Sequence, residues 1–143
     1  MARILAIDYG QKRAGLAVTD PLQMIANGLD TVNSGELLLY LRAYFNREDV
    51  ELVILGYPKQ LNNKASKAVL YVNEFIRQFE KNFPGRKYFL LDERYTSKMA
   101  FQTMIDGGLK KKKRRDKSLI DKISATILLQ SYLEMKLNFH TSK

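Results

Sequence analysis

Short apolar runs alternate with longer amphipathic segments along most of this chain, and this alternation restricts the fold strongly. Apolar runs of about four to eight residues predict buried strands, and apolar residues repeated every three or four positions predict helices. Strands connected through crossover helices require a mixed sheet that is covered on both faces, so an α/β fold is predicted. The expected strands lie within 4–10, 11–20, 28–32, 51–56 and 86–91, and the expected helices within 33–45, 64–83, 99–106 and 116–138.

The length of 143 residues fits one domain with a single substantial core. We find no internal repeat, low-complexity linker or break in composition that would mark a second domain. The domain is expected to cover residues 1–138, and residues 139–143 are expected to form a polar tail that contains His140.

The first strand ends in an acid and a glycine, Asp8-Tyr9-Gly10, and a short basic turn with Lys12 and Arg13 follows. Glycine lets the backbone turn sharply, so the Asp8 carboxylate is expected at the carboxyl end of the strand. A carboxylate beside cationic side chains suits a metal ion that must meet a phosphate. An Asp that caps the turn explains the same residues equally well.

Two further acidic positions stand out. Asp92 and Glu93 follow the strand at 86–91, but successive strand residues face opposite sides, so both cannot serve one site unless the strand has already turned. Asp121 lies on the helix face that carries Ala125 and Leu128, where a carboxylate is costly unless it is paired or bound to metal. Periodicity therefore favours Asp121 as a ligand over surface decoration.

The chain has no cysteine and a single histidine, so a metal would be held by oxygen ligands or by that histidine. Carboxylate oxygens suit Mg²⁺ or Mn²⁺, and two such ions about 3.5–4 Å apart can activate a water and stabilise the leaving oxygen in phosphodiester cleavage. No serine–histidine or cysteine–histidine pair suggests a competing covalent mechanism.

The charge balance favours a polyanionic partner. There are 24 Lys and Arg residues against 15 Asp and Glu, a net charge of +9 and a pI near 9.7. No apolar run is long enough to cross a membrane, the start lacks a signal-peptide layout, and cysteine is absent, so a cytoplasmic location with nucleic acid as partner is predicted. The candidate nucleic-acid contacts are Lys12, Arg13, Arg94 and the consecutive cations Lys110, Lys111, Lys112, Lys113, Arg114 and Arg115. The consecutive cations also fit a solvated loop.

Three segments in order resemble the YqgF family, also called RuvX or Holliday-junction-resolvase-like proteins. They are 8–20, which opens Asp-Tyr-Gly, 92–97, Asp-Glu-Arg-x-Thr-Ser, and 120–133, which opens Ile-Asp. The resemblance implies an RNase H-like fold and a metal-dependent nuclease that matures the 5′ end of the small-subunit rRNA precursor, with Asp8, Glu93 and Asp121 as catalytic metal ligands. Older descriptions of the family imply Holliday junction resolution. The chain departs from the family pattern at 59–64, which lacks an acid and a further glycine, and at Ser124, where alanine is usual.

Other functions fit parts of the pattern. A strand ending in Asp-x-Gly also opens the sugar kinase and actin-like ATPase fold, but that fold needs two domains and this chain accommodates one. A non-catalytic ribosome or transcription factor would share the charge, although carboxylates placed together repel phosphate unless a metal lies between them. RNA and branched DNA remain open as substrates. A four-way junction would favour a symmetric dimer, and the sequence leaves monomer and homodimer open.

Overall fold

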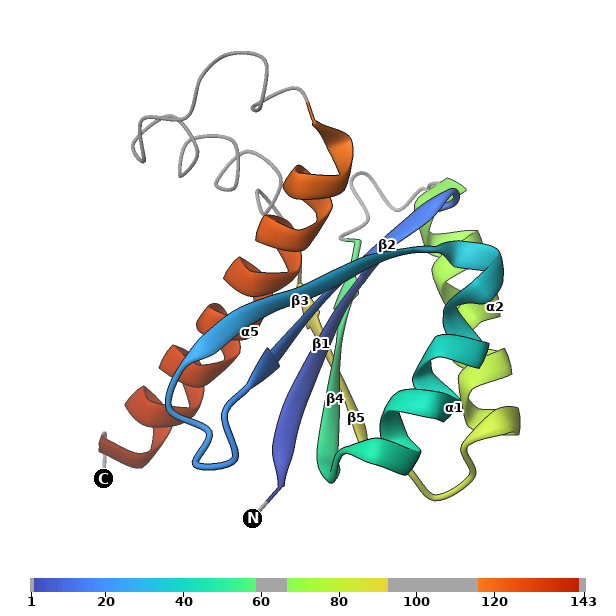
Figure 1. Ribbon diagram of the computed structural model, residues 1–143. Helices are drawn as coiled ribbons and strands as arrows, with labels where there is room; N and C mark the ends of the chain where they lie inside the picture. Colours follow the sequence, from blue (N-terminus) through green and yellow to red (C-terminus); the bar gives the residue numbers. More distant parts are fainter. Residues whose placement is uncertain (1, 59–66, 93–115, 142–143) are drawn as a thin grey trace.

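The structure is a computed structural model that describes residues 2–58, 67–92 and 116–141, with side chains described up to Leu137 in the last helix (Figure 1). The predicted helix at 99–106, the loop at 59–64 and the basic run at 110–115 lie outside these residues. The described elements are β1 Arg3–Tyr9, β2 Arg13–Thr19, β3 Ala26–Asn33, the 3₁₀ helix η1 Ser34–Glu36, α1 Leu37–Arg47, β4 Val50–Tyr57, α2 Lys67–Asn82, β5 Tyr88–Asp92 and α5 Lys117–Thr141.

The described strands form one mixed sheet in the order β3-β2-β1-β4-β5. β1, β2 and β3 pair as antiparallel neighbours, whereas β4 pairs parallel with both β1 and β5. Figure 1 shows α1 and α2 together on one side of this sheet and α5 on the other. The predicted mixed sheet with helices on both faces is therefore confirmed.

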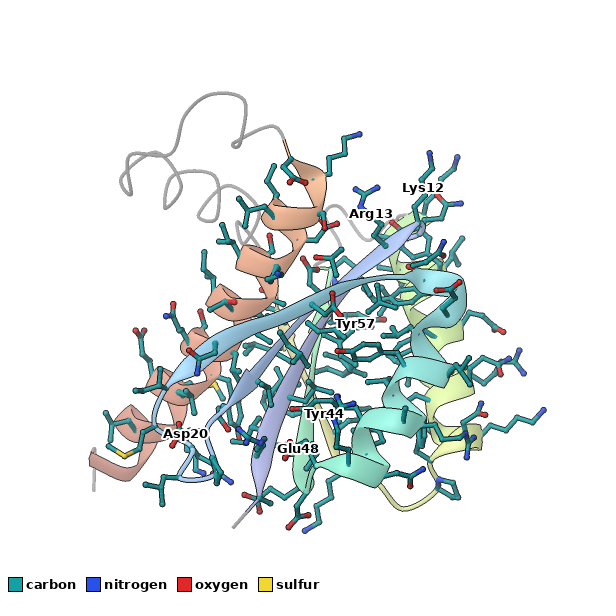
Figure 2. The ribbon with its side chains drawn as sticks, in the orientation of Figure 1. Lys12, Arg13, Asp20, Tyr44, Glu48 and Tyr57 are labelled. Carbon is teal, nitrogen blue, oxygen red and sulfur yellow. The ribbon has the colours of Figure 1, made fainter. Side chains whose placement is uncertain are left out.

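The face under α1 and α2 carries large side chains. Leu5 and Ile7 of β1 are fully buried there, and Phe75 and Phe79 of α2 pack against the same cluster. The Tyr9 ring stacks on Phe75 with ring centroids 4.5 Å apart, and Figure 2 shows Tyr44 of α1 turned toward the sheet. Rings supply much apolar area per residue, so this face contributes most of the buried hydrophobic surface.

The opposite face carries smaller side chains and lies under α5. Its buried residues are Ile4, Ala6, Ala17 and Ile54 from the sheet and Ala125, Leu128 and Leu129 from the helix. Short side chains between a helix and a sheet let their backbones approach closely. The prediction that Ala125 and Leu128 face inward is confirmed by their burial.

Element ends agree with the sequence signals to within a few residues. Asn33 caps η1 with a side-chain oxygen that accepts a hydrogen bond from the Gly35 amide at 3.1 Å. The main correction is at the C-terminus, where α5 continues to Thr141 instead of ending at 138 before a polar tail. Polar residues do not by themselves end a helix, and 139–143 contains no proline or glycine. Among the described residues, none of the helices combines the length and apolar character needed to cross a membrane.

Candidate active site

Asp8 lies near the carboxyl end of β1, on the face covered by α5. Along β1, Ile4 and Ala6 belong to the α5-side cluster, while Leu5 and Ile7 belong to the opposite core. Side chains alternate along a strand, so Asp8 follows Ile4 and Ala6 onto the α5 face. The neighbouring Tyr9 faces the other side, where burial raises the pKa of its phenol, so it stays protonated at neutral pH.

The turn that follows Asp8 is tightly constrained. The Gly10 amide donates to the Arg13 carbonyl oxygen at 2.9 Å, and a side chain at Gly10 would place its Cβ 2.7 Å from that oxygen. Ser34 supports the turn from outside, because its hydroxyl donates to the Gly10 carbonyl at 2.6 Å and its amide donates to the Lys12 carbonyl at 2.9 Å. The turn therefore presents Lys12 and Arg13 at a defined position (Figure 2).

Gly15 brings Asp8 and Asp121 to one place. It is the partner of Asp8 in the β1–β2 register, so both residues share the α5 face. A Cβ built on Gly15 would lie 1.9 Å from the backbone carbonyl oxygen of Asp121, so any side chain at this position would clash with the α5 backbone. The absence of a side chain at Gly15 thus allows α5 to seat Asp121 directly over the strand position opposite Asp8.

The Asp121 carboxylate is held by an ion pair between α5 and β2. Arg13 Nε donates to Asp121 Oδ2 at 2.8 Å, and the two side chains are 38% and 24% exposed. Arg13 shares the α5 face with Gly15, because the intervening Ala14 points into the opposite core. An aspartate, an arginine and a second aspartate therefore gather at this edge of the sheet, which is the edge at which the first strand ends.

The structure also bears on the choice between Asp92 and Glu93, which the sequence left open. In β5, Leu91 packs against the α5-side cluster and Tyr88 against the opposite core. Alternation places Asp92 on the Tyr88 side, away from the face of Asp8. Glu93 and Arg94 lie outside the described residues, as does the basic run from Lys110 to Arg115.

The donor chemistry at Asp8 and Asp121 fits a hard divalent cation, since carboxylate oxygens are the ligands that Mg²⁺ and Mn²⁺ prefer. Within the described part of the chain no group of three or more acidic, histidine or cysteine side chains could hold a metal. The third predicted ligand, Glu93, lies outside that part. The two described aspartates would supply two of the three expected ligands.

Sequence reasoning missed two features of this site. The ion pair of Arg13 with Asp121 was not predicted, and the expected contact of Arg13 with nucleic acid stays a prediction. The role of Gly15 was also missed, although its place in the first motif, paired by a hairpin with Asp8, was an available signal. Lys12 is exposed at the turn, as a phosphate contact would need to be.

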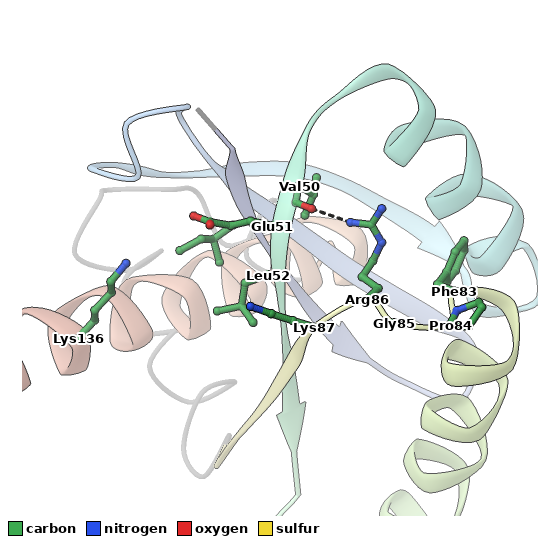
Figure 3. A pocket seen from close by; sticks show the side chains of 10 residues that line it. Val50, Glu51, Leu52, Phe83, Pro84, Gly85, Arg86, Lys87 and Lys136 are labelled. Carbon is green, nitrogen blue, oxygen red and sulfur yellow. Dashed lines mark hydrogen bonds between the residues drawn. The ribbon is translucent and has the colours of Figure 1, made fainter.

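A pocket of about 590 Å³ opens at the other end of the sheet (Figure 3). It is lined by the starts of β1 and β4 and by the segment that leads into β5, with Arg86, Lys87 and Lys136 among its side chains. Arg86 is engaged there, because its Nη1 donates to the Val50 carbonyl at 2.6 Å and its guanidinium lies 3.8 Å from the Phe45 ring centroid. This pocket lies at the opposite end of β1 from Asp8, so its volume does not mark the candidate site.

The sequence matches the RuvX family, described as Holliday junction resolvase, over residues 2–135. Relatives from Christiangramia forsetii and Flavobacterium psychrophilum carry the name "Putative pre-16S rRNA nuclease". The first is 57% identical over 133 residues, which are 93% of this chain and 98% of the relative. The second is 55% identical over 137 residues, which are 96% of this chain and 100% of the relative.

Solved structures with a similar fold include RuvC of Thermus thermophilus in complex with a Holliday junction substrate. That chain matches with a TM-score of 0.54 at 18% identity, over 94% of this chain and 96% of RuvC. A second structure of T. thermophilus RuvC gives a TM-score of 0.52 at 17% identity with the same coverage. At such identities the likeness concerns the fold, and it confirms the predicted RNase H-like architecture.

Proposed function

The chain belongs to the RuvX family and is a nuclease; we propose that it cleaves phosphodiester bonds in the precursor of 16S rRNA, using a divalent cation held by Asp8, Glu93 and Asp121. The single observation that carries the metal site is the convergence of Asp8 and Asp121 on one face of the sheet through Gly15. Two carboxylates placed together next to a nucleic-acid partner need a cation between them and the phosphate.

The three acids would bind the cation, and the elements that carry Asp8 and Asp121 would fix its position. Asp8, Glu93 and Asp121 would hold Mg²⁺ or Mn²⁺, and the bound cation would supply the activation of water and the stabilisation of the leaving oxygen. β1 and α5 are rigid elements of the core, so the two described aspartates are held in place before the substrate arrives.

The substrate is held by positive charge. Lys12 is exposed in the turn that follows β1, and Arg94 and the run 110–115 add cations elsewhere in the sequence. Contacts of this kind bind the phosphate backbone without reading its sequence. Replacing Lys110–Lys113 by glutamine should weaken nucleic-acid binding and flatten its dependence on salt, because each lost contact removes about one unit of counter-ion release. A salt slope equal to that of the parent protein would reduce the run to a solvated loop.

The relatives named for pre-16S rRNA are more than half identical to this chain over nearly its whole length, whereas RuvC resembles it in fold alone. This difference supports rRNA over branched DNA as the substrate. A role in processing rRNA implies a cytoplasmic location, where ribosomes are made.

The direct test is cleavage of a labelled 16S rRNA precursor and of a four-way DNA junction in parallel, with Mg²⁺, with Mn²⁺ and with EDTA. Asp8→Asn and Asp121→Asn should each reduce cleavage by more than about 100-fold, since even outer partners of metal ligands cost about 10–100-fold. Both variants should keep the circular dichroism and melting temperature of a folded protein, because they change no core volume.

The carboxylates after β5 provide a matched pair of variants. Glu93→Gln should abolish cleavage, and Asp92→Asn should leave it near the parent rate, since Asp92 lies on the opposite face of the sheet. Loss of cleavage in Asp92→Asn alone would transfer the role to Asp92. Binding without cleavage in every metal would leave a nucleic-acid-binding protein, and preference for the junction would overturn the RNA assignment.

A further inference from the structure

We propose that Arg13 is a positioning residue that holds Asp121 in the cation-free protein, is displaced when a divalent cation binds, and then turns its guanidinium toward the substrate phosphate. This inference rests on the proposed function, because it assumes that Asp121 binds the cation. It assigns to one side chain two successive partners, a carboxylate and then a phosphate.

The first partner is visible in the structure. Arg13 Nε lies 2.8 Å from Asp121 Oδ2, which is a charge-assisted hydrogen bond. The hydrogen bond joins β2 to α5, and the turn before Arg13 is tied to Ser34, so the guanidinium is directed at the carboxylate by fixed backbone. Both side chains keep part of their surface in water, so the pair can separate without leaving either charge buried and unpaired.

The charges explain why the pair should separate. Asp8 and Asp121 bring two negative charges to one face of the sheet, and in the cation-free protein Arg13 offsets part of their repulsion. A guanidinium cannot lose its proton in a protein. A dication bound to Asp121 would compete with the guanidinium for the carboxylate oxygen that accepts from Arg13, and would cancel much of the negative charge that attracts Arg13 there.

The released guanidinium has a suitable second partner. The planar guanidinium matches phosphate oxygens in a two-point contact, which lysine cannot make. Arg13 lies on the same face of the sheet as Asp8, next to the exposed Lys12 at the turn (Figure 2). Cation loading would thus prepare the protein to bind its substrate, and substrate would bind poorly to the cation-free protein while Arg13 is engaged.

An arrangement in which Arg13 keeps its hydrogen bond to Asp121 after the cation binds makes a different prediction. If Arg13 stayed on Asp121 as a supporting outer partner of the cation, its loss would weaken cation binding, as the loss of such partners usually does. If Arg13 competes for Asp121, its loss strengthens cation binding. The sign of the change separates the two.

The experiment measures Mn²⁺ binding directly, from the electron paramagnetic resonance signal of free Mn²⁺, with no substrate present. Arg13→Gln should bind Mn²⁺ about fivefold more tightly than the parent protein, the change expected from releasing one partly exposed ion pair. Lys12→Gln is the matched control, because it removes the same charge from the same turn without removing the ion pair to Asp121, and its affinity should move by much less. Arg13→Lys, which keeps the charge, should lie between the parent and Arg13→Gln.

The Asp121→Asn background distinguishes the inference from the proposed function. In that background Mn²⁺ binding should be weak and Arg13→Gln should have no further effect. Weaker binding in Arg13→Gln, or a change no larger than that of Lys12→Gln, would overturn the role of Arg13 alone. Mn²⁺ binding that is insensitive to Asp121→Asn would overturn the metal site itself.

Discussion

The two faces of the sheet are built from side chains of different size, and the two faces contribute differently to stability and to the placement of charged groups. Between the sheet and the helices α1 and α2 lie leucines, isoleucines, tyrosines and phenylalanines, of which Phe79 of α2 is fully buried. Under α5 the sheet presents Ile4, Ala6, Ala17 and Ile54, and Gly15 lies beside Asp121.

Large side chains bury much apolar surface and hold the helices at a distance from the sheet. Small side chains bury less, but they let the α5 backbone approach β2 closely, where the Asp121 carboxylate meets Arg13. The α1–α2 face therefore chiefly stabilises the fold, and the α5 face chiefly positions charge. Substitutions on the two faces should accordingly separate stability from cation binding.

Phe79→Ala should produce the largest loss of stability. Removing a fully buried phenylalanine leaves a cavity among Phe75, Phe83 and Tyr88, and such changes cost about 3–5 kcal/mol in the free energy of unfolding. Urea unfolding would measure this, with Leu39→Ala, an exposed residue on α1, as the control expected to cost about 0.5 kcal/mol or less. Mn²⁺ affinity of the folded fraction should not change, and a parallel loss of affinity would contradict the division between the faces.

Gly15→Ala should have a smaller effect on stability and a larger effect on the site. Its Cβ would overlap the Asp121 backbone, so α5 must shift, at a cost of about 1–3 kcal/mol for overpacking. We expect Mn²⁺ binding and cleavage to fall together. The matched control is Gly35→Ala, where the nearest atom to an added Cβ lies at an ordinary 3.6 Å. A folded Gly15→Ala protein with the parent affinity would show that close approach of α5 is not needed.

Ser124→Ala should stabilise the protein by about 1 kcal/mol, because its hydroxyl is buried on the α5 face without a hydrogen-bond partner in the described structure. Ser131→Ala, on the same helix but partly exposed, corrects for the difference in helix propensity. Thermal unfolding of both variants gives the comparison. A net loss of stability in Ser124→Ala would mean that the hydroxyl has a partner, such as an ordered water.

Asp20 lies in the loop between β2 and β3, outside both faces, and should give the smallest effect. Its carboxylate accepts hydrogen bonds from the amides of Leu22, Met24 and Ile25, and the bond from Ile25 contributes most to a pKa below the usual 3.8. A lowered folded-state pKa contributes stability that is present above about pH 4 and is lost as the pH falls through that pKa. Asp20→Ala should therefore be less stable than the parent at pH 6, and the difference should shrink toward pH 3 in urea unfolding. A difference independent of pH would exclude this contribution.

The sequence by itself determined the strands and helices of the described residues, the mixed sheet, and the choice of Asp8 and Asp121 as candidate metal ligands. Strands and helices follow from periodicity among neighbouring residues, which is written directly in the chain. Asp8 was recognisable because it ends an apolar strand, and Asp121 because a carboxylate interrupts an inward-facing stripe. The end of α5 was missed by three residues, because nothing in the local sequence marks the end of the helix.

Only the tertiary structure decided which face each strand residue occupies and what lies across from it. Alternation shows that Asp92 and its neighbour differ in direction, but packing of Leu91 and Tyr88 was needed to say which side Asp92 takes. The ion pair between Arg13 and Asp121 joins residues 108 positions apart, so no local pattern could reveal it. It depends on how closely a helix packs against a sheet, and that distance is set by side chains from several elements at once, with Gly15 at the point of contact.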